Sequence, residues 1–286
     1  MSILELIKYI FLGIVQGLTE VLPISSSGHV AIFQQILSID SDEGLLFLIL
    51  VNFGSLISIF YYFRKMIYKL CADFILFIFK PTSRLKTREG FFYCLMVIIG
   101  IIPIGVVGLL FAGQINSFYQ DHYLLIVGVG LLMTATFLFL AKEKAKNNGR
   151  QSMKFSDSIW IGIAQTAAIL PGLSRSAVAT TTGLFRKMSM ETSLNFSFML
   201  YIPISVGSFL QYVYLLLLNP NSDAVGLNPG NSYQWLYYAA ALIASVFATY
   251  FALKLLFKLF RNGNLLPFSL YTFFVGMIVL IVGMTQ

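Results

Sequence analysis

Long apolar runs, more than any single motif, limit how this chain can fold. Six of them are close to the roughly 20 residues that a helix needs to cross the hydrocarbon core of a bilayer. They cover about 44–63, 90–110, 123–141, 192–218, 234–257 and 265–285. Only 11% of the 286 residues are charged, against about 25% in soluble globular proteins. The chain is expected to be an all-α integral membrane protein with six transmembrane helices, since a β-barrel would show ~10-residue alternating segments.

The positions of the cations predict the topology. Of the nineteen Lys and Arg residues, only Lys8 and Arg175 fall outside the loops and helix ends assigned to the cytoplasm, which is the positive-inside pattern. The loops 64–88 and 142–154 are expected inside, a short apolar segment at 73–79 at the interface, and the loops 113–122 and 219–234 and the C-terminal Gln286 outside. The net charge of +7 follows from this pattern, so no nucleic-acid partner is expected.

Two further apolar stretches are broken by proline, each into a longer and a shorter segment. These are 3–22 and 27–38 around Pro23, and 155–170 and 176–185 around Pro171. Such pairs are typical of re-entrant hairpins, whose irregular backbone must be covered by protein or line a cavity. The second is expected to enter from the cytoplasm, because it returns to Arg186 and Lys187. The first is expected to enter from outside, because the span at 44–63 must then carry the chain inward.

The two broken stretches also resemble each other without a gap. Gly13 falls on Gly162, Gln16 on Gln165, and Ser25-Ser26-Ser27 on Ser174-Arg175-Ser176. Three spans follow each hairpin, so the chain is interpreted as one membrane domain, 1–286, made of two inverted-topology repeats, 1–141 and 155–286. Two chance matches of a Ser-Pro motif, the alternative, would not explain the equal spacing and the opposed orientation.

Three ionisable side chains, Glu20, His29 and Arg175, lie in the broken stretches. A charge at the bilayer centre costs about 2.5–3.5 kcal/mol even on the mildest scale, so a functional site is the first hypothesis. The alternative is a Glu20–Arg175 ion pair that only fixes the fold. Glu20 and His29 could move protons or hold a divalent cation, and a seryl hydroxyl could act as the nucleophile.

Each triplet, Ser25–Ser27 and Ser174–Ser176, begins a short helix. Helix N-termini present free N–H groups and the positive end of a dipole, so two of them facing each other would bind an anion. The planar fork of Arg175 suits phosphate. The sequence therefore predicts a site for phosphate or diphosphate in apolar surroundings, as on a lipid with an anionic head.

Two signatures carry a resemblance to a known family. Gln16-Gly-Leu-Thr-Glu20-Val-Leu-Pro-Ile-Ser-Ser-Ser-Gly-His29 resembles the first signature of the bacterial undecaprenyl-diphosphatase family of the bacitracin-resistance type, and Pro171-Gly-Leu-Ser-Arg-Ser176 resembles the second. The likeness covers nearly the whole chain, including Asn52-Phe-Gly-Ser55 and Asn195-Phe-Ser-Phe198. It departs at Ala179, where the family has Thr; either the adjacent Thr180 substitutes or that hydroxyl is dispensable.

The resemblance implies hydrolysis of undecaprenyl diphosphate to undecaprenyl phosphate and phosphate, which recycles the lipid carrier of cell-wall synthesis and gives bacitracin resistance. It also implies a divalent cation (Mg²⁺ or Ca²⁺), a site in the bacterial plasma membrane open to the outer face, and a homodimer. Carried over by position, the catalytic residues are Glu20, Ser26, His29 and Arg175, with Glu20 also the candidate metal ligand. The expected substrate-binding residues are Gln16, Ser25, Ser27, Ser174, Ser176 and Thr180. A flippase for lipid phosphates is the alternative, since inverted repeats around a midplane site are typical of transporters.

Overall fold

The computed structural model describes residues 2–39, 44–120, 123–218, 233–260 and 263–285. Helices account for the ordered elements of these ranges, with one isolated bridge between Arg150 and Met188. They are α1 (Ile3–Val21), α2 (Ser26–Ile36), α3 (Gly44–Phe79), η2 (Pro81–Ser83), α4 (Arg84–Gln120), α5 (Tyr123–Ala145), α6 (Phe155–Thr166), η3 (Ala167–Ile169), α7 (Arg175–Phe185), α8 (Met190–Leu218), α9 (Gln234–Phe260) and α10 (Leu266–Thr285). The predicted all-α class is confirmed.

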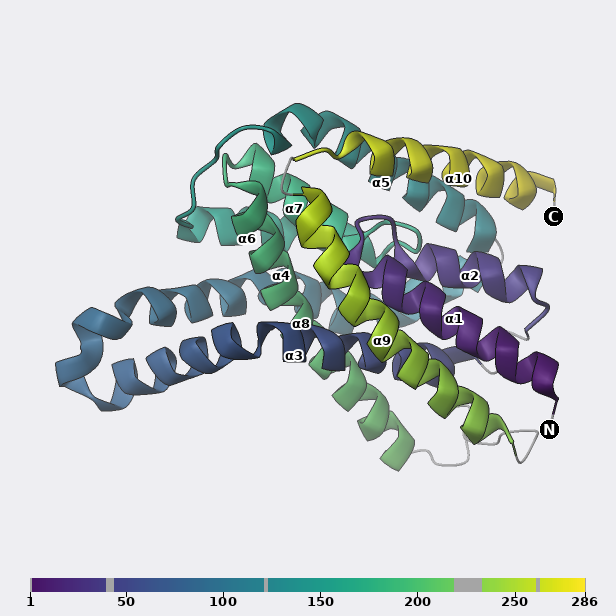
Figure 1. Ribbon diagram of the computed structural model, residues 1–286, viewed down its shortest axis with the longest axis horizontal. Helices are drawn as coiled ribbons and strands as arrows, with labels where there is room; N and C mark the ends of the chain where they lie inside the picture. The colour runs from purple at the N-terminus through teal and green to yellow at the C-terminus, as the bar shows by residue number, and fades with distance from the viewer. Residues whose placement is uncertain (1, 40–43, 121–122, 219–232, 261–262, 286) are drawn as a thin grey trace.

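Six helices in the described part of the chain are long and apolar enough to cross a membrane, namely α3, α4, α5, α8, α9 and α10. They coincide with the six predicted spans. The four helices of the broken stretches, α1, α2, α6 and α7, are not among them, and they begin and end within a few residues of the predicted segments. The N- and C-termini lie at one end of the molecule, opposite the tip of the α3–α4 hairpin (Figure 1).

The prediction that residues 64–88 form a loop, with a separate interfacial segment at 73–79, is wrong, while their cytoplasmic side stays a prediction. Helix α3 runs unbroken to Phe79, η2 makes the turn, and α4 begins at Arg84. The sequence has no Gly or Pro between Gly54 and Pro81, and Lys and Arg favour helix as strongly as Leu does. The helix therefore continues past its apolar run, and the two helix ends form the hairpin at the left of Figure 1.

The predicted outer loop at 113–122 is also wrong in its described part, because α4 continues to Gln120. A glycine such as Gly113 weakens a helix by only about 1 kcal/mol, so it does not end one by itself. Residues 121–122, residues 219–232 of the second predicted outer loop, and Gln286 lie outside the described residues.

Glycine lets helices from the two halves of the chain approach closely. Helix α1 packs along α9, and α6 packs along α4. A Cβ on Gly13 would collide with the backbone of Ala241, and one on Gly162 would collide with the backbone of Gly100. Gly13 and Gly162 are the residues that coincide in the gapless superposition of the two broken stretches. Each therefore allows its helix to approach the backbone of a helix from the other half of the chain.

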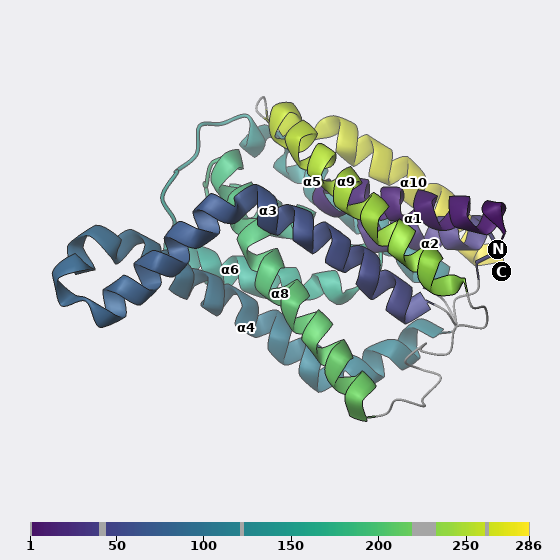
Figure 2. The same cartoon turned by 60° about the horizontal axis from the view of Figure 1, so that its bottom comes forward.

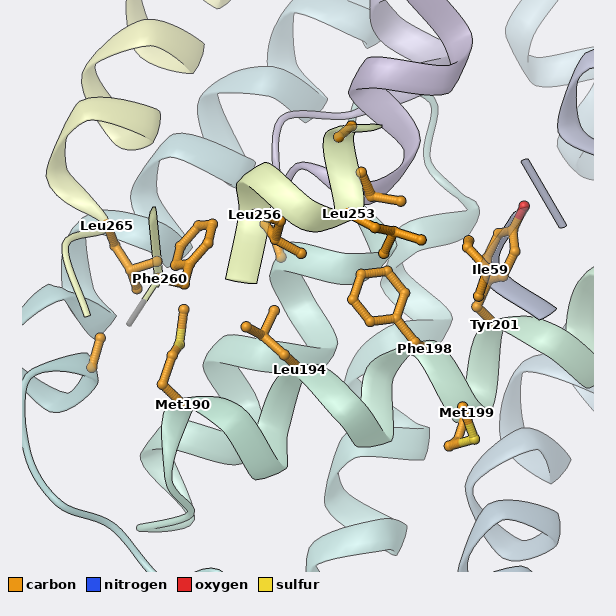
Figure 3. Packing of buried hydrophobic residues seen from close by; sticks show 14 of the residues in the cluster. Ile59, Met190, Leu194, Phe198, Met199, Tyr201, Leu253, Leu256, Phe260 and Leu265 are labelled. Atoms are coloured by element: carbon orange, nitrogen blue, oxygen red, sulfur yellow. The ribbon is translucent and has the colours of Figure 1, made fainter. Parts of the chain in front are cut away.

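Helix α8 lies between α3 and α4 in the turned view of Figure 2 and contacts both. Its Leu194 and Phe198 pack against Leu253 and Leu256 of α9 in the largest apolar cluster (Figure 3). Tyr201, one turn beyond Phe198, belongs to the same cluster and also lines the polar pocket described below. The apolar core thus forms the support of the site.

A buried carboxylate ties the cation-rich ends of α6 and α7 together. Asp157 is fully buried, and it accepts hydrogen bonds from Arg150 Nη2 (2.9 Å), Arg186 Nε (3.0 Å) and the Lys154 N–H (3.0 Å). Burial by itself would raise the pKa of Asp157, but the hydrogen bonds from Arg150, Lys154 and Arg186 outweigh it and hold the pKa below its ordinary value. These hydrogen bonds hold the beginning of α6 against the end of α7.

Candidate active site

The two serine triplets build matching helix starts. Ser25 Oγ accepts a hydrogen bond from the N–H of Gly28 (3.3 Å), and Ser174 Oγ accepts one from the N–H of Ala177 (3.2 Å). Within each triplet the first and third hydroxyls contact each other, at 3.3 Å for Ser25 and Ser27 and at 3.1 Å for the second triplet. Ser and Thr oxygens are strongly preferred at such caps, because they satisfy N–H groups that the helix leaves free.

Glu20 lies between these two helix starts and joins them. Its Oε1 accepts a hydrogen bond from Arg175 Nη2 at 3.0 Å, and its Oε2 accepts one from Ser26 Oγ at 2.5 Å. The Glu20 side chain is 6% exposed and that of Arg175 26% exposed. The structure thus brings together three residues that the sequence placed in two stretches about 150 positions apart.

Two amides orient the Glu20 carboxylate from the side of α1 and α3. Gln16 Nε2 donates to Glu20 Oε2 at 2.7 Å and to Asn52 Oδ1 at 2.9 Å. Asn52 Nδ2 in turn donates to the carbonyl of Leu48 at 2.9 Å, so the Asn52 oxygen is left to accept from Gln16, and Gln16 presents its N–H group to Glu20. Asn52 was not predicted as a site residue, although an Asn within an apolar span was a signal that could have identified it.

The Tyr201 ring packs against the guanidinium group of Arg175. The guanidinium carbon lies 4.5 Å from the centre of the Tyr201 ring, a cation–π contact. The Tyr201 hydroxyl donates to the carbonyl of Asn52 at 3.3 Å. Sequence reasoning missed this residue too, and the sequence offered no signal, because Tyr201 is one of 42 Phe and Tyr residues in the chain.

These groups line a pocket of about 300 Å³. The predicted residues on its wall are Gln16, Glu20, Ser25, Ser26, Ser27, Ser174, Arg175 and Ser176. The rest of the wall is mixed. It includes apolar side chains such as Leu48, Phe53 and Phe209 and polar ones such as Gln34, Ser205 and Ser208, and it extends to Tyr123, the first residue of α5. The pocket therefore combines the polar groups around Glu20 with apolar side chains, as a lipid with a charged head requires.

Two predicted site residues, His29 and Thr180, do not line this pocket. The ring of His29 is turned away, with Nδ1 2.7 Å from the carbonyl of Ser25 and Nε2 2.8 Å from the hydroxyl of Tyr271. Thr180 is buried in α7, and its hydroxyl has no hydrogen-bond partner among the described residues. Ala179 faces an apolar cluster that contains Phe196. Neither Ala179 nor Thr180 therefore places a hydroxyl on the wall of this pocket.

The donor atoms of the pocket are suited to a hard cation. Glu20 supplies a carboxylate, and the wall also holds the hydroxyl groups of Ser25, Ser26 and Ser27, oxygen ligands of the type that Mg²⁺ and Ca²⁺ prefer. Over the described residues, no group of three or more His, Cys, Asp or Glu side chains gathers into a metal cluster. Mg²⁺ commonly needs only one or two carboxylates when substrate phosphates complete its shell, so the residues present fit such an ion.

Comparison with known proteins gives matches over nearly the whole chain. Residues 9–278 match the family described as bacitracin resistance protein BacA. The chain is 35% identical over 276 residues to the undecaprenyl-diphosphatase of Oceanobacillus iheyensis, covering 96% of both chains. It is 36% identical over 281 residues to undecaprenyl-diphosphatase 1 of Bacillus licheniformis, covering 98% of this chain and 99% of the relative. The undecaprenyl-diphosphatase of Alkaliphilus metalliredigens is 36% identical over 280 residues, with coverage of 96% and 97%.

Proposed function

The chain belongs to the family of the bacitracin resistance protein BacA, and we propose that it hydrolyses undecaprenyl diphosphate in the pocket around Glu20. The products are undecaprenyl phosphate and phosphate, so the enzyme is a membrane phosphatase that returns the lipid carrier to cell-wall synthesis. Relatives named undecaprenyl-diphosphatase match almost the full length of the chain. The observation that supports the location of the site is the convergence of Ser26 and Arg175 on one carboxylate.

The diphosphate binds between the two helix starts. The N-termini of α2 and α7 offer N–H groups and positive dipole ends, and Ser25, Ser27, Ser174 and Ser176 offer hydroxyl donors. Arg175 supplies the fixed charge, and its fork can hold two phosphate oxygens at once. The prenyl chain leaves the pocket along its apolar wall toward the membrane. Thr180 has no part in this binding, because it lies outside the pocket.

The contact between Ser26 and Glu20 supports a nucleophile and its base. Glu20 takes the proton of the Ser26 hydroxyl while Oγ forms a bond to the terminal phosphorus, and the bond to the bridging oxygen breaks. Undecaprenyl phosphate leaves with that oxygen. It also takes the proton from Glu20, which becomes a carboxylate again. Glu20 then takes a proton from water as the water oxygen bonds to phosphorus, and passes it to Ser26 Oγ as the bond between Oγ and phosphorus breaks and phosphate leaves. Arg175 holds the negative charge that develops on the phosphoryl oxygens.

A divalent cation would be held by Glu20 together with the diphosphate oxygens, and it would supply further charge neutralisation. Gln16 supports that role as well, because its hydrogen bond orients the Glu20 carboxylate, and Asn52 holds the Gln16 amide in place.

The proposal includes two inverted repeats, 1–141 and 155–286, with opposed re-entrant hairpins α1–α2 and α6–α7. The equivalent contacts of Gly13 and Gly162 with opposite halves support it. So does the pocket wall, which reaches the beginnings of α3 and α5 at Leu48 and Tyr123. These ends lie opposite the Lys- and Arg-rich ends of the same helices, so the pocket opens to the outer face. The homodimer stays a prediction.

Phosphate release by the purified protein in detergent micelles tests this function against a lipid-phosphate flippase. Hydrolysis needs no bilayer, so undecaprenyl diphosphate should be converted to undecaprenyl phosphate with equimolar phosphate. A flippase would release nothing in detergent and would move a labelled lipid phosphate only in vesicles. Lipid movement in vesicles without phosphate release in either preparation would reject the hydrolase.

A further inference from the structure

The turn that carries Ser26 has an unusual backbone. Ser25 has φ of 72° and ψ of 100°, in a region that non-glycine residues avoid because Cβ crowds the backbone. The equivalent residue of the second stretch, Ser174, has φ of −71° and ψ of 115°, an ordinary extended conformation. Something must hold the first turn in place, because a relaxed Ser25 would carry Ser26 Oγ away from Glu20.

His29 contacts this turn at its strained residue. The carbonyl of Ser25 lies 2.7 Å from His29 Nδ1 and 3.3 Å from the His29 backbone N–H. A carbonyl can only accept, so Nδ1 carries the proton. In the neutral ring Nε2 is then an acceptor, and the Tyr271 hydroxyl at 2.8 Å donates to it. The two rings also stack, with centroids 5.5 Å apart and planes inclined by 13°.

The second stretch lacks such a support. Superposition of Ser25 on Ser174 puts Val178 at the place of His29, and a valine cannot hold a carbonyl by its side chain. There the turn is fixed differently, by a hydrogen bond from the Ser174 N–H to Thr134 Oγ1 at 2.9 Å. The imidazole is therefore found at the turn that has the left-handed residue and is missing from the turn that does not.

We propose that Tyr271 is a positioning residue of this site: through His29 it holds the Ser25 carbonyl, and so keeps Ser26 Oγ against Glu20. This role rests on the proposed hydrolase. Tyr271 belongs to α10 and is not on the pocket wall, so it does not touch the substrate. His29 acts here as the link between the two, since one ring nitrogen contacts the Ser25 carbonyl and the other the Tyr271 hydroxyl.

The role predicts a specific kinetic pattern. Tyr271→Phe keeps the stacked ring and removes only the hydroxyl. We expect kcat to fall by about fivefold, the population change that loss of one ordinary hydrogen bond produces. KM should change by less than about twofold, because Arg175 and the serines that bind phosphate are untouched. Tyr68→Phe is the matched control: that tyrosine is 78% exposed on α3, and its variant should behave as wild type.

A second pair of variants tests whether His29 acts as this link or as a base. Asn and Leu have similar size, but only the Asn side chain has an N–H that can replace Nδ1 on the Ser25 carbonyl. We expect His29→Asn to be at least about tenfold more active than His29→Leu, since neither can act as a general base. Adding Tyr271→Phe to His29→Leu should cost nothing further, because the link is already broken.

The outcomes separate the two proposals. Equal kcat in Tyr271→Phe and wild type would overturn the positioning role while leaving the hydrolase intact. Equal, near-complete loss in His29→Asn and His29→Leu would overturn it too, and would assign proton transfer to His29. A Tyr271→Phe effect confined to KM would contradict positioning of the nucleophile. A wild-type protein that releases no phosphate would reject the hydrolase, and the positioning role with it.

Discussion

Replacing Arg175 by lysine tests how the site holds its anion. The guanidinium makes two contacts that an ammonium cannot make together, a hydrogen bond to Glu20 Oε1 at 3.0 Å and a stack on the Tyr201 ring at 4.5 Å. The N–H groups not bound to Glu20 remain available for phosphate oxygens. Arg175→Lys keeps the positive charge, so any loss measures geometry and not net charge.

The magnitude follows from the contacts that are lost. A desolvated cation–π contact contributes about 1–2 kcal/mol, and one charge-assisted hydrogen bond to a phosphoryl oxygen about 1.5–3 kcal/mol. Lysine retains part of both, so we expect the barrier to rise by about 1.5–4 kcal/mol. With tenfold in rate for each 1.36 kcal/mol, kcat/KM should fall by about tenfold to a thousandfold.

The assay is phosphate release from undecaprenyl diphosphate by purified protein, with thermal unfolding measured in parallel. Arg64→Lys is the control, since it makes the same chemical change at an exposed arginine of α3 that lies over the Tyr61 ring. We expect the control to match wild type. Turnover of Arg175→Lys within about threefold of wild type, a change under 1 kcal/mol, would refute the bidentate clamp.

Three further changes test other parts of the account. Asp157→Asn should lower the unfolding free energy by about 2–3 kcal/mol, since two partly exposed arginines lose a buried partner. The control Glu143→Gln breaks the exposed pair with Lys146 and should cost under about 1 kcal/mol. Because the fold lowers the pKa of Asp157 from 3.8, its contribution should persist above pH 3.8 and disappear in acid, as thermal unfolding against pH will show. Gln16→Ala should reduce turnover by only about tenfold, because it orients Glu20 by one hydrogen bond. With single cysteines in a background without the two native ones, an impermeant thiol reagent on intact cells should label position 116 and not 144; the reverse would reject the topology.

The membrane spans could be predicted from the sequence because the bilayer imposes a length on apolar runs. Where those runs end was less accessible. Hydropathy marks where a helix leaves the apolar phase, not where it ends. Beyond Gly54, α3 meets no Gly or Pro until Pro81, and α4 continues through Gly113. The loops at 64–88 and 113–122 were therefore predicted too long, although the spans on either side of them were placed correctly.

The centre of the site could be predicted for a different reason. Glu20, Ser26 and Arg175 stand out because polar groups are costly in apolar surroundings, and the structure brings them into contact. Asn52 and Tyr201 complete the same network from α3 and α8. Their part depends on which spans lie side by side, which periodicity alone does not reveal. The sequence also marks His29 as a candidate site residue, but it does not predict that the ring contacts Ser25 and Tyr271.

The Glu20–Arg175 pair has two interpretations, an ion pair that only holds helices together and a reaction centre. Its surroundings favour the second. The pair borders a pocket of about 300 Å³ and is not enclosed in packed apolar side chains. By contrast, the carboxylate of Asp157 is fully buried and bound on both oxygens by arginine, as a structural clasp should be. The two carboxylates therefore illustrate the two uses of an ion pair in one chain.

Turnover of Glu20→Gln tests the central claim most directly. Glutamine has nearly the same shape and can keep a hydrogen bond to Arg175, but it cannot take the proton of Ser26. Phosphate release should fall by at least about a hundredfold, the usual contribution of a general base, with unfolding temperature near that of wild type. The loss should also exceed that of Gln16→Ala. Activity within about tenfold of wild type, or a greater loss in Gln16→Ala, would contradict Glu20 as the base of the reaction.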